Sequence, residues 1–145
     1  MGLAFNRRER LMAPTDERSL AMLVALAVAV GGALGALARY GLDRFVQHHV
    51  LTVFPWSTFT INVTGCLLVG VLIGALVDRH HTPEWLRIGT VLGFLGAYTT
   101  FSTFAQETLD LAEGPHLSVA FVYSVGSVAL GVAAVALGLG LGRTL

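Results

Sequence analysis

The chemically unusual part of the sequence is GFLGAYTTFSTF at residues 93–104, where glycines and hydroxyl-bearing residues crowd into an apolar segment. Glycine and two consecutive threonines weaken a helix, and threonine hydroxyls compete for its backbone hydrogen bonds. We therefore expect a helix break between Gly96 and Thr99. Freed carbonyl groups in a membrane helix line a cavity or bind an ion, and a hard cation such as Na⁺ would suit them. A kink that serves packing alone explains the residues equally well.

Two phenylalanines, Phe101 and Phe104, lie on one face of the segment that follows the expected break. Aromatic residues at this spacing usually face lipid or a protein core, but the edge of a phenyl ring carries partial positive charge and attracts a small anion. Ser102 and Thr103 add hydroxyl donors beside them. This segment could therefore guide an anion or simply pack.

Four further polar side chains lie inside apolar segments or at their ends, where each needs a partner. Asn62 has two N–H donors, which either join helices or serve an anion. Arg39 either extends to the membrane interface or collects anions near a pore mouth. Tyr123 and Ser127 are four residues apart on one helical face, where they continue a polar track or make ordinary hydrogen bonds between helices.

The sequence contains no pairing of nucleophile and base, no phosphate-binding loop and no haem motif, so we expect that the protein is not an enzyme. The five histidines lie in polar joints without metal-ligand spacing. Cys66 is alone in an apolar run and is interpreted as a small buried hydrophobe. Glu107 ends the third apolar segment, and we expect it to reach water.

The composition points to a membrane protein, because 54% of the residues are hydrophobic and only 12% are charged, with a mean hydropathy of +0.72. Soluble domains carry about 25% charged residues, and half that share cannot keep a globule in water. The formal net charge is zero, so no basic field supports binding to nucleic acid.

Four apolar stretches have the length of about 20 residues that a bilayer-spanning helix needs. They are residues 20–38, 58–77, 88–106 and 117–142. The polar joints between them are short, so consecutive helices should be antiparallel neighbours in one all-α bundle. These joints are residues 43–49, 78–84 and 110–115.

Residues 1–19 are expected to be a disordered charged tail, and residues 20–145 to be the transmembrane domain. Small residues at helical spacing should let the helix backbones approach closely. They are Gly31, Gly35, Ala38, Gly65, Gly70, Gly126, Gly131 and Gly138. Four helices enclose little interior, so a transport path through one copy would be cramped and a dimer is expected.

Together these features resemble the CrcB/Fluc family of fluoride channels, over residues 20–142. The matching segments are GGALGALARY (31–40), TINVTG (60–65), GFLGAYTTFSTF (93–104), and Tyr123 with Ser127. The third segment is highly specific to that family. The others are individually common but occur here in the right order.

The resemblance implies an antiparallel, dual-topology homodimer with two fluoride pores and a central structural Na⁺, in the cell membrane of a prokaryote. Gly96 and Thr99 would offer backbone carbonyls to the Na⁺. The activity would be passive efflux of fluoride from the cytoplasm, which protects against fluoride toxicity. The fluoride path would be lined by Asn62, Phe101, Ser102, Thr103, Phe104, Tyr123 and Ser127, with Arg39 near its entrance.

The distribution of arginines conflicts with dual topology. Counted over the whole chain, they lie mainly on the side of the termini, which the positive-inside rule places in the cytoplasm. Either the arginine-rich tail is not translated, or the chain pairs with a paralogous partner in a heterodimer of fixed orientation.

A second interpretation is a small multidrug-resistance-type exporter, which is also a four-helix antiparallel dimer. Such proton-coupled carriers need a carboxylate buried in the first helix. Residues 20–38 contain none, so the fluoride channel is the favoured interpretation.

Overall fold

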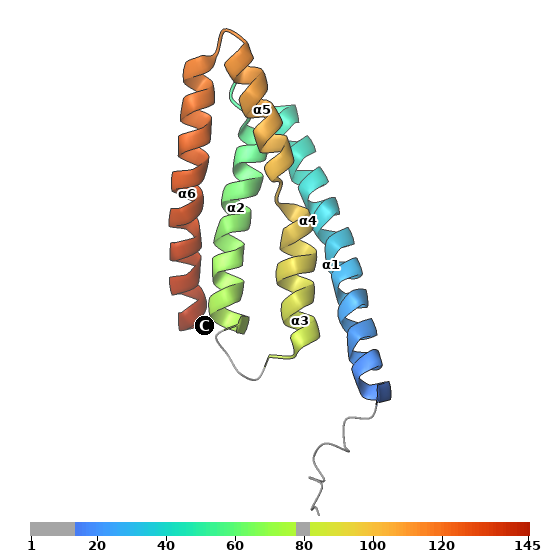
Figure 1. Cartoon of the computed structure of the whole chain (residues 1–145). Coiled ribbons are helices and arrows are strands. Elements are labelled where there is room, and N and C mark those ends of the chain that lie inside the picture. Colours follow the sequence, from blue (N-terminus) through green and yellow to red (C-terminus); the bar gives the residue numbers. More distant parts are fainter. Residues whose placement is uncertain (1–13, 78–81) are drawn as a thin grey trace, which may run out of the picture.

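The computed structural model describes residues 14–77 and 82–145, and every regular element in these ranges is a helix (Figure 1). In chain order the elements are α1 (Pro14–His49), α2 (Trp56–Leu72), the π-helical η1 (Ile73–Val77), α3 (Glu84–Ile88), the π-helical η2 (Gly89–Leu95), α4 (Gly96–Tyr98), α5 (Phe101–Glu113) and α6 (Leu117–Thr144).

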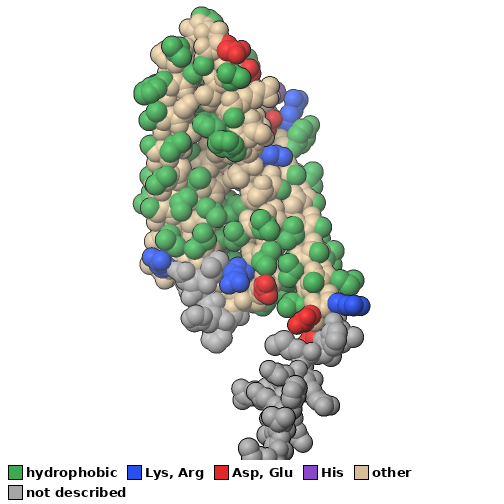
Figure 2. All heavy atoms as spheres, in the orientation of Figure 1, with side chains coloured by type: hydrophobic (Ala, Val, Ile, Leu, Met, Phe, Trp, Pro, Cys, Tyr) green, Lys and Arg blue, Asp and Glu red, His purple; other side chains and the backbone are tan. Residues whose placement is uncertain are grey.

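Within the described residues these elements form four spans long and apolar enough to cross a membrane. The spans are Asp16–His49, Trp56–Leu76, Glu84–Glu113 and Leu117–Thr144. The protein is therefore a multi-pass, all-α membrane protein, as the sequence predicts. Hydrophobic side chains cover the middle of the face drawn in Figure 2, and charged ones gather at its two ends and on its upper right flank.

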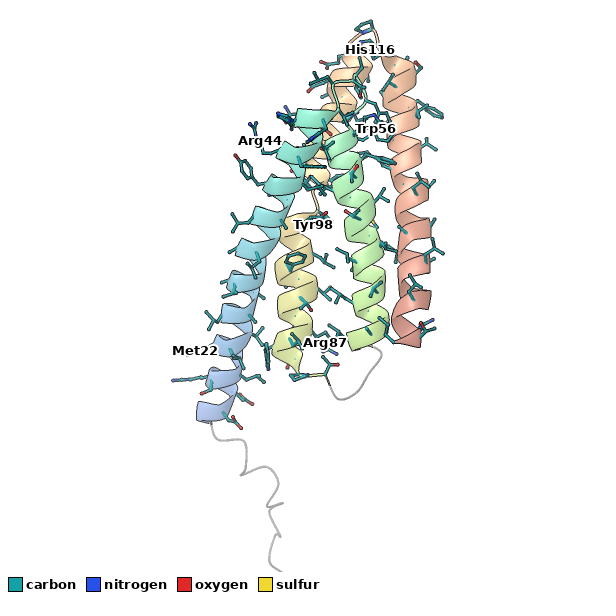
Figure 3. All side chains as sticks on the ribbon, turned by 180° about the vertical axis from the view of Figure 1, so that it is seen from behind. Met22, Arg44, Trp56, Arg87, Tyr98 and His116 are labelled. Atoms are coloured by element: carbon teal, nitrogen blue, oxygen red, sulfur yellow. The ribbon has the colours of Figure 1, made fainter. Side chains whose placement is uncertain are left out.

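Consecutive spans run antiparallel, so α1 begins and α6 ends at the same end of the bundle (Figure 1). The main packing partners are α2 with α6, and α1 with η2. Arg44, Trp56 and His116 lie toward one end of the molecule, whereas Met22 and Arg87 lie toward the other (Figure 3). An arginine thus lies toward each end, and Trp56 lies toward one of them, as suits a membrane–water interface.

Helices α2 and α6 touch backbone to backbone through glycines. A Cβ atom on Gly70 would clash with the Val135 carbonyl of α6, and one on Gly138 would clash with the Leu67 carbonyl of α2. The predicted close approach is confirmed for these two glycines. Gly126, in contrast, faces open space, since a Cβ there would meet no atom within 4 Å.

The contact of α1 with η2 is built in the same way. A Cβ on Gly31 would meet the Gly89 carbonyl, and one on Gly35 would meet the Phe94 carbonyl. This confirms both predicted packing glycines of α1. Because α1 and η2 lie this close, α1 is held against the part of the third span that precedes the extended residues described below.

Helix α1 is longer in both directions than the predicted residues 20–38. It begins at Pro14, so residues 14–19, predicted as disordered tail, are helical, while residues 1–13 lie outside the described ranges. It ends at His49, so the joint predicted at residues 43–49 is also wrong. No proline interrupts this stretch, and Gln47 Nε2 donates to Asp43 Oδ1 at 2.8 Å across one turn, which supports the helix.

The predicted joint at residues 110–115 is likewise shorter in the structure. Residues 110–113 are the last turn of α5, which ends at Glu113 where Gly114 caps it by donating its N–H to the Asp110 carbonyl at 3.2 Å. The charges of this turn are compatible with a helix because they lie at its end, outside the apolar middle of the span.

The third span leaves helical geometry at two consecutive threonines. Thr99 has φ −81° and ψ 161°, and Thr100 has φ −146° and ψ 120°, so both are extended. Gly96, at the start of the predicted interval, is helical with φ −61° and ψ −34°. Because threonine is β-branched and stiff at χ1, it tolerates an extended backbone better than a helical one. The extended residues therefore coincide with the Thr-Thr pair and not with the glycine.

Candidate functional site

Asn62 of α2 is bonded to the extended residues of the third span. Its Nδ2 donates to the Thr100 carbonyl and its Oδ1 accepts from the Thr100 N–H, both at 2.9 Å. The two bonds replace those that the Thr100 peptide would make inside a continuous helix. An amide nitrogen carries two hydrogens, and Nδ2 makes this one bond within the described residues.

Because of this pairing, the Thr100 N–H does not donate to a carbonyl of the preceding turn. In an α-helix the N–H of Thr100 would donate to the carbonyl four residues earlier, which belongs to Gly96, but here it donates to Asn62. The Thr99 N–H still reaches the Leu95 carbonyl at 3.0 Å. The Gly96 carbonyl is therefore deprived of its usual helical partner.

Gly96 and Thr99, the two predicted cation ligands, line one hollow of about 390 Å³, called here the threonine hollow. A Cβ added to Gly96 would meet no atom within 4 Å, so this residue lies at an open surface. The hollow is lined by Asn62, Cys66, Val69, Val91, Leu95, Gly96, Thr99, Thr100 and Phe101.

A second hollow, called here the polar groove, has a volume of about 490 Å³ and lies between α1, α2 and α5. It brings together Arg39, Ser102 and Thr103, which the sequence singled out on two separate segments. The groove is lined by Ala36, Arg39, Tyr40, Asp43, Gln47, Thr58, Ile61, Thr100, Ser102, Thr103 and Glu107.

Thr100 organises the hydroxyl groups at the start of α5. Its Oγ1 caps the helix by accepting from the Thr103 N–H at 3.3 Å, and its own hydroxyl donates to Thr103 Oγ1 at 3.0 Å. The Thr103 oxygen thus accepts a bond, which leaves its hydrogen to be donated elsewhere. Ser102 Oγ lies at the limit of bonding distance, 3.5 Å from Thr100 Oγ1. Both side chains are exposed in the groove.

Glu107 is half-buried and is held by hydroxyls from two other helices. Thr58 Oγ1 donates to Oε1 at 2.9 Å, and Tyr123 Oη donates to Oε2 at 2.7 Å. The sequence predicts that Glu107 reaches water and lies close enough to Phe101 and Phe104 to influence access. One local signal indicates more, because it lies four residues after Thr103 and three after Phe104 and so shares their helical face.

The rings of Phe101 and Phe104 are neighbours, with centroids 5.9 Å apart. Phe101 is 79% exposed and lines the threonine hollow, whereas Phe104 is half-buried and packs on Tyr123 with centroids 5.1 Å apart. The two rings therefore connect the outer surface of α5 with its contact to α6.

Tyr123 and Ser127 differ in what surrounds their hydroxyls. Tyr123 is fully buried, packs edge-on against Phe54, and has its hydroxyl bonded to Glu107, so it joins α5 to α6. Ser127 Oγ is buried and has no hydrogen-bond partner among the described residues. A buried hydroxyl without a partner is costly, so Ser127 has a donor to offer to another molecule.

Comparisons with known proteins point in one direction. The family model described as "CrcB-like protein, Camphor Resistance (CrcB)" matches residues 26–139. A protein of Acidobacterium capsulatum named "Fluoride-specific ion channel FluC" is 48% identical over 118 residues, which cover 80% of this chain and 93% of that protein. Proteins with the same name from Rhizobium leguminosarum and Nitrobacter winogradskyi are 40% identical over 124 residues and 43% identical over 120. These matches cover 86% and 83% of this chain, and 99% and 95% of those proteins.

Proposed function

The chain belongs to the CrcB-like family, and from that premise we propose that it is a fluoride-specific ion channel that lets fluoride leave the cytoplasm passively through a prokaryotic cell membrane. Its four spans provide the membrane domain that such a channel needs. Release of fluoride down its electrochemical gradient would protect the cell against fluoride toxicity.

The polar groove is the observation that carries the proposal at the level of residues. It gathers one guanidinium, from Arg39, with the hydroxyls of Ser102 and Thr103. Fluoride is small, strongly hydrated and only accepts hydrogen bonds. A groove that offers cationic and hydroxyl donors can replace its water stepwise.

Donors that the protein has not already used are the ones available to fluoride. The hydroxyl hydrogen of Thr103, the second Nδ2 hydrogen of Asn62 and the Ser127 hydroxyl meet this condition within the described residues. The partly positive ring edges of Phe101 and Phe104 would attract fluoride more weakly than these donors do. The Tyr123 hydroxyl is committed to Glu107, so in our proposal it shapes the path instead of binding the ion.

The residues of the threonine hollow fit a structural Na⁺. The Gly96 carbonyl lacks the N–H partner that a helix would provide, and Thr99 adds a carbonyl and a hydroxyl on the same hollow. Na⁺ is a hard cation that takes neutral oxygen ligands of this kind. When bound, it supplies positive charge that stabilises the unpaired carbonyls of the third span. Gly96 and Thr99 would hold it through their backbone oxygens.

An antiparallel, dual-topology homodimer is the assembly we propose. The open surface at Gly96, the exposed ring of Phe101 and the uncovered Gly126 are features of this chain that a second copy could cover. A pairing with a paralogous chain of fixed orientation would use the same surfaces. The two assemblies can be distinguished by labelling a cysteine placed after Thr144 from each side of the membrane. Labelling from both sides indicates dual topology, and labelling from one side indicates a fixed orientation.

The proposed function is tested with the purified protein in liposomes loaded with fluoride or with chloride. We expect rapid fluoride efflux after the membrane potential is shunted, and chloride efflux no faster than from protein-free liposomes. Equal chloride efflux, or absent fluoride efflux with Na⁺ on both sides, would contradict the proposal. As a cellular check, a deletion strain should grow more poorly in fluoride at low pH and recover with the intact gene.

A further inference from the structure

Asp43 is a carboxylate in a groove that we assign to an anion. It lies on α1 one turn after Arg39, is half-buried, and lines the polar groove together with Arg39 and Glu107. Helix α1 carries it near the end of the molecule where Arg44 and Trp56 lie (Figure 3). A negative charge at the mouth of an anion path works against entry, so its position requires an explanation.

Its side chain is fixed by two donors. Ser57 Oγ and Gln47 Nε2 both donate to Asp43 Oδ1, the second at 2.8 Å. Ser57 is only 8% exposed and lies in the first turn of α2, whose positive end favours a carboxylate. Two hydrogen bonds therefore fix the position of the Asp43 carboxyl group at the groove.

The neighbouring residue of α2 holds the other carboxylate of the groove. Ser57 donates to Asp43 of α1, and Thr58 donates to Glu107 of α5 at 2.9 Å. Two adjacent residues at the start of α2 thus hold two carboxylates from two different helices. Arg39 is the one cationic side chain among the groove's described lining residues, so two acidic side chains and one guanidinium line the groove.

We propose that Asp43 sets the rate at which fluoride enters the polar groove, by offsetting the attraction that Arg39 exerts on anions. This inference rests on the proposed function, because it takes the groove as the entrance for fluoride. Fixed charges at the mouth of a narrow path change the local concentration of a charged substrate and its rate of entry. A fixed carboxylate one turn from the arginine lowers that concentration for every anion.

The discriminating variant is Asp43→Asn, which removes the charge and keeps the Oδ1 acceptor for Ser57 and Gln47. Fluoride efflux from liposomes is compared at ionic strengths of about 10 mM and about 1 M, where the Debye length is about 30 Å and about 3 Å. An impermeant salt sets the ionic strength at constant Na⁺. We expect efflux about threefold faster than wild type at low ionic strength, and equal to wild type at high.

Two further variants make the test independent of the folding of one protein. Gln47→Glu adds a negative charge at an exposed position of the same groove, and should slow efflux at low ionic strength only. Asp110→Asn removes an exposed carboxylate of α5 that does not line the groove. Its fluoride efflux should match that of the wild type at both ionic strengths.

The outcomes separate the inference from the proposed function. Wild-type fluoride efflux with no salt-dependent difference in Asp43→Asn or Gln47→Glu overturns the role of Asp43 and leaves the channel proposal standing. A change of equal size at both ionic strengths also overturns it, because packing and not charge would then be responsible. A wild-type protein that passes no fluoride overturns both.

Discussion

Asn62 and Thr100 are joined by two hydrogen bonds of 2.9 Å, one in each direction, between the side-chain amide of Asn62 and the backbone N–H and carbonyl of Thr100. This pair stabilises the place where the third span is extended. It does so from another helix, so α2 and the third span are fixed relative to each other at the level of the threonine hollow. Packing and the candidate site therefore depend on the same contact.

Replacement of Asn62 by alanine should destabilise the fold. The Thr100 N–H and carbonyl would lose both partners in a half-buried position, which costs about 1–3 kcal/mol for an unsatisfied buried group. The thermal unfolding midpoint in detergent measures the effect. Thr90→Ala is the matched control, because the Thr90 hydroxyl bonds to carbonyls of its own turn, those of Leu86 and Arg87, at 2.7 and 3.2 Å. Equal midpoints for the two variants would show that the Asn62 pair contributes nothing.

Gly138→Ala should disrupt the packing of α6 on α2. The new methyl group would collide with the Leu67 carbonyl, and overpacking of this kind costs about 1–3 kcal/mol. Gly140, on the same helix, has open space where a Cβ would lie, so Gly140→Ala should leave the unfolding midpoint unchanged. A comparison of the two midpoints, with the elution profile from size exclusion, checks the prediction.

The apolar architecture could be predicted from the sequence because it depends on local properties. Span number follows from runs without charge, and the close contacts at Gly31, Gly35, Gly70 and Gly138 follow from small residues at helical spacing. Helix ends were harder to predict. Polar residues near the ends of α1 and α5 stay helical because they lie beyond the apolar middle of each span, so charge alone does not mark a joint.

The polar contacts of the site were less predictable, because each joins residues far apart in the chain. Nothing near Glu107 in the sequence shows that Thr58 and Tyr123 donate to it, or that Ser57 donates to Asp43. Thr99 and Thr100, which the sequence indicates are unfavourable to a helix, have extended backbone angles. Their exact geometry depends on Asn62, because the Thr100 N–H donates to Asn62 and not to the Gly96 carbonyl.

Ser127→Ala should slow fluoride efflux without loss of stability. The Ser127 hydroxyl has no partner among the described residues, so its removal breaks no hydrogen bond among them and removes a buried polar group. If the hydroxyl serves fluoride, efflux from liposomes should fall about tenfold, the effect of about 1.4 kcal/mol on a barrier. Ser124→Ala removes a hydroxyl that bonds to the Ala120 carbonyl at 2.8 Å and should pass fluoride at the wild-type rate. Unchanged efflux in Ser127→Ala would exclude this role.

Tyr123→Phe should lower stability more than Tyr40→Phe does. The hydroxyl donates at 2.7 Å to the Glu107 carboxylate in a fully enclosed position, and hydrogen bonds to charged groups contribute about 1.5–3 kcal/mol. Tyr40 is 65% exposed, so Tyr40→Phe should change stability by less than about 0.5 kcal/mol. Thermal midpoints of both variants test the difference, and a larger fall for Tyr40→Phe would be inconsistent with the structure.

Na⁺ should stabilise the protein selectively, and the effect should require Asn62. A ligand that binds only the folded state stabilises it in proportion to the logarithm of its concentration above the dissociation constant. We therefore expect the thermal unfolding midpoint to rise as Na⁺ replaces N-methylglucamine at constant ionic strength. In Asn62→Ala the two bonds that hold Thr100 extended are lost, so the carbonyls of the proposed site are no longer fixed in position. The rise with Na⁺ should be lost in this variant and retained in Thr90→Ala. If the thermal midpoint of Asn62→Ala still rises with Na⁺, the cation binds elsewhere in the molecule. If N-methylglucamine, added in place of Na⁺, raises the wild-type midpoint equally, the effect is not selective for Na⁺.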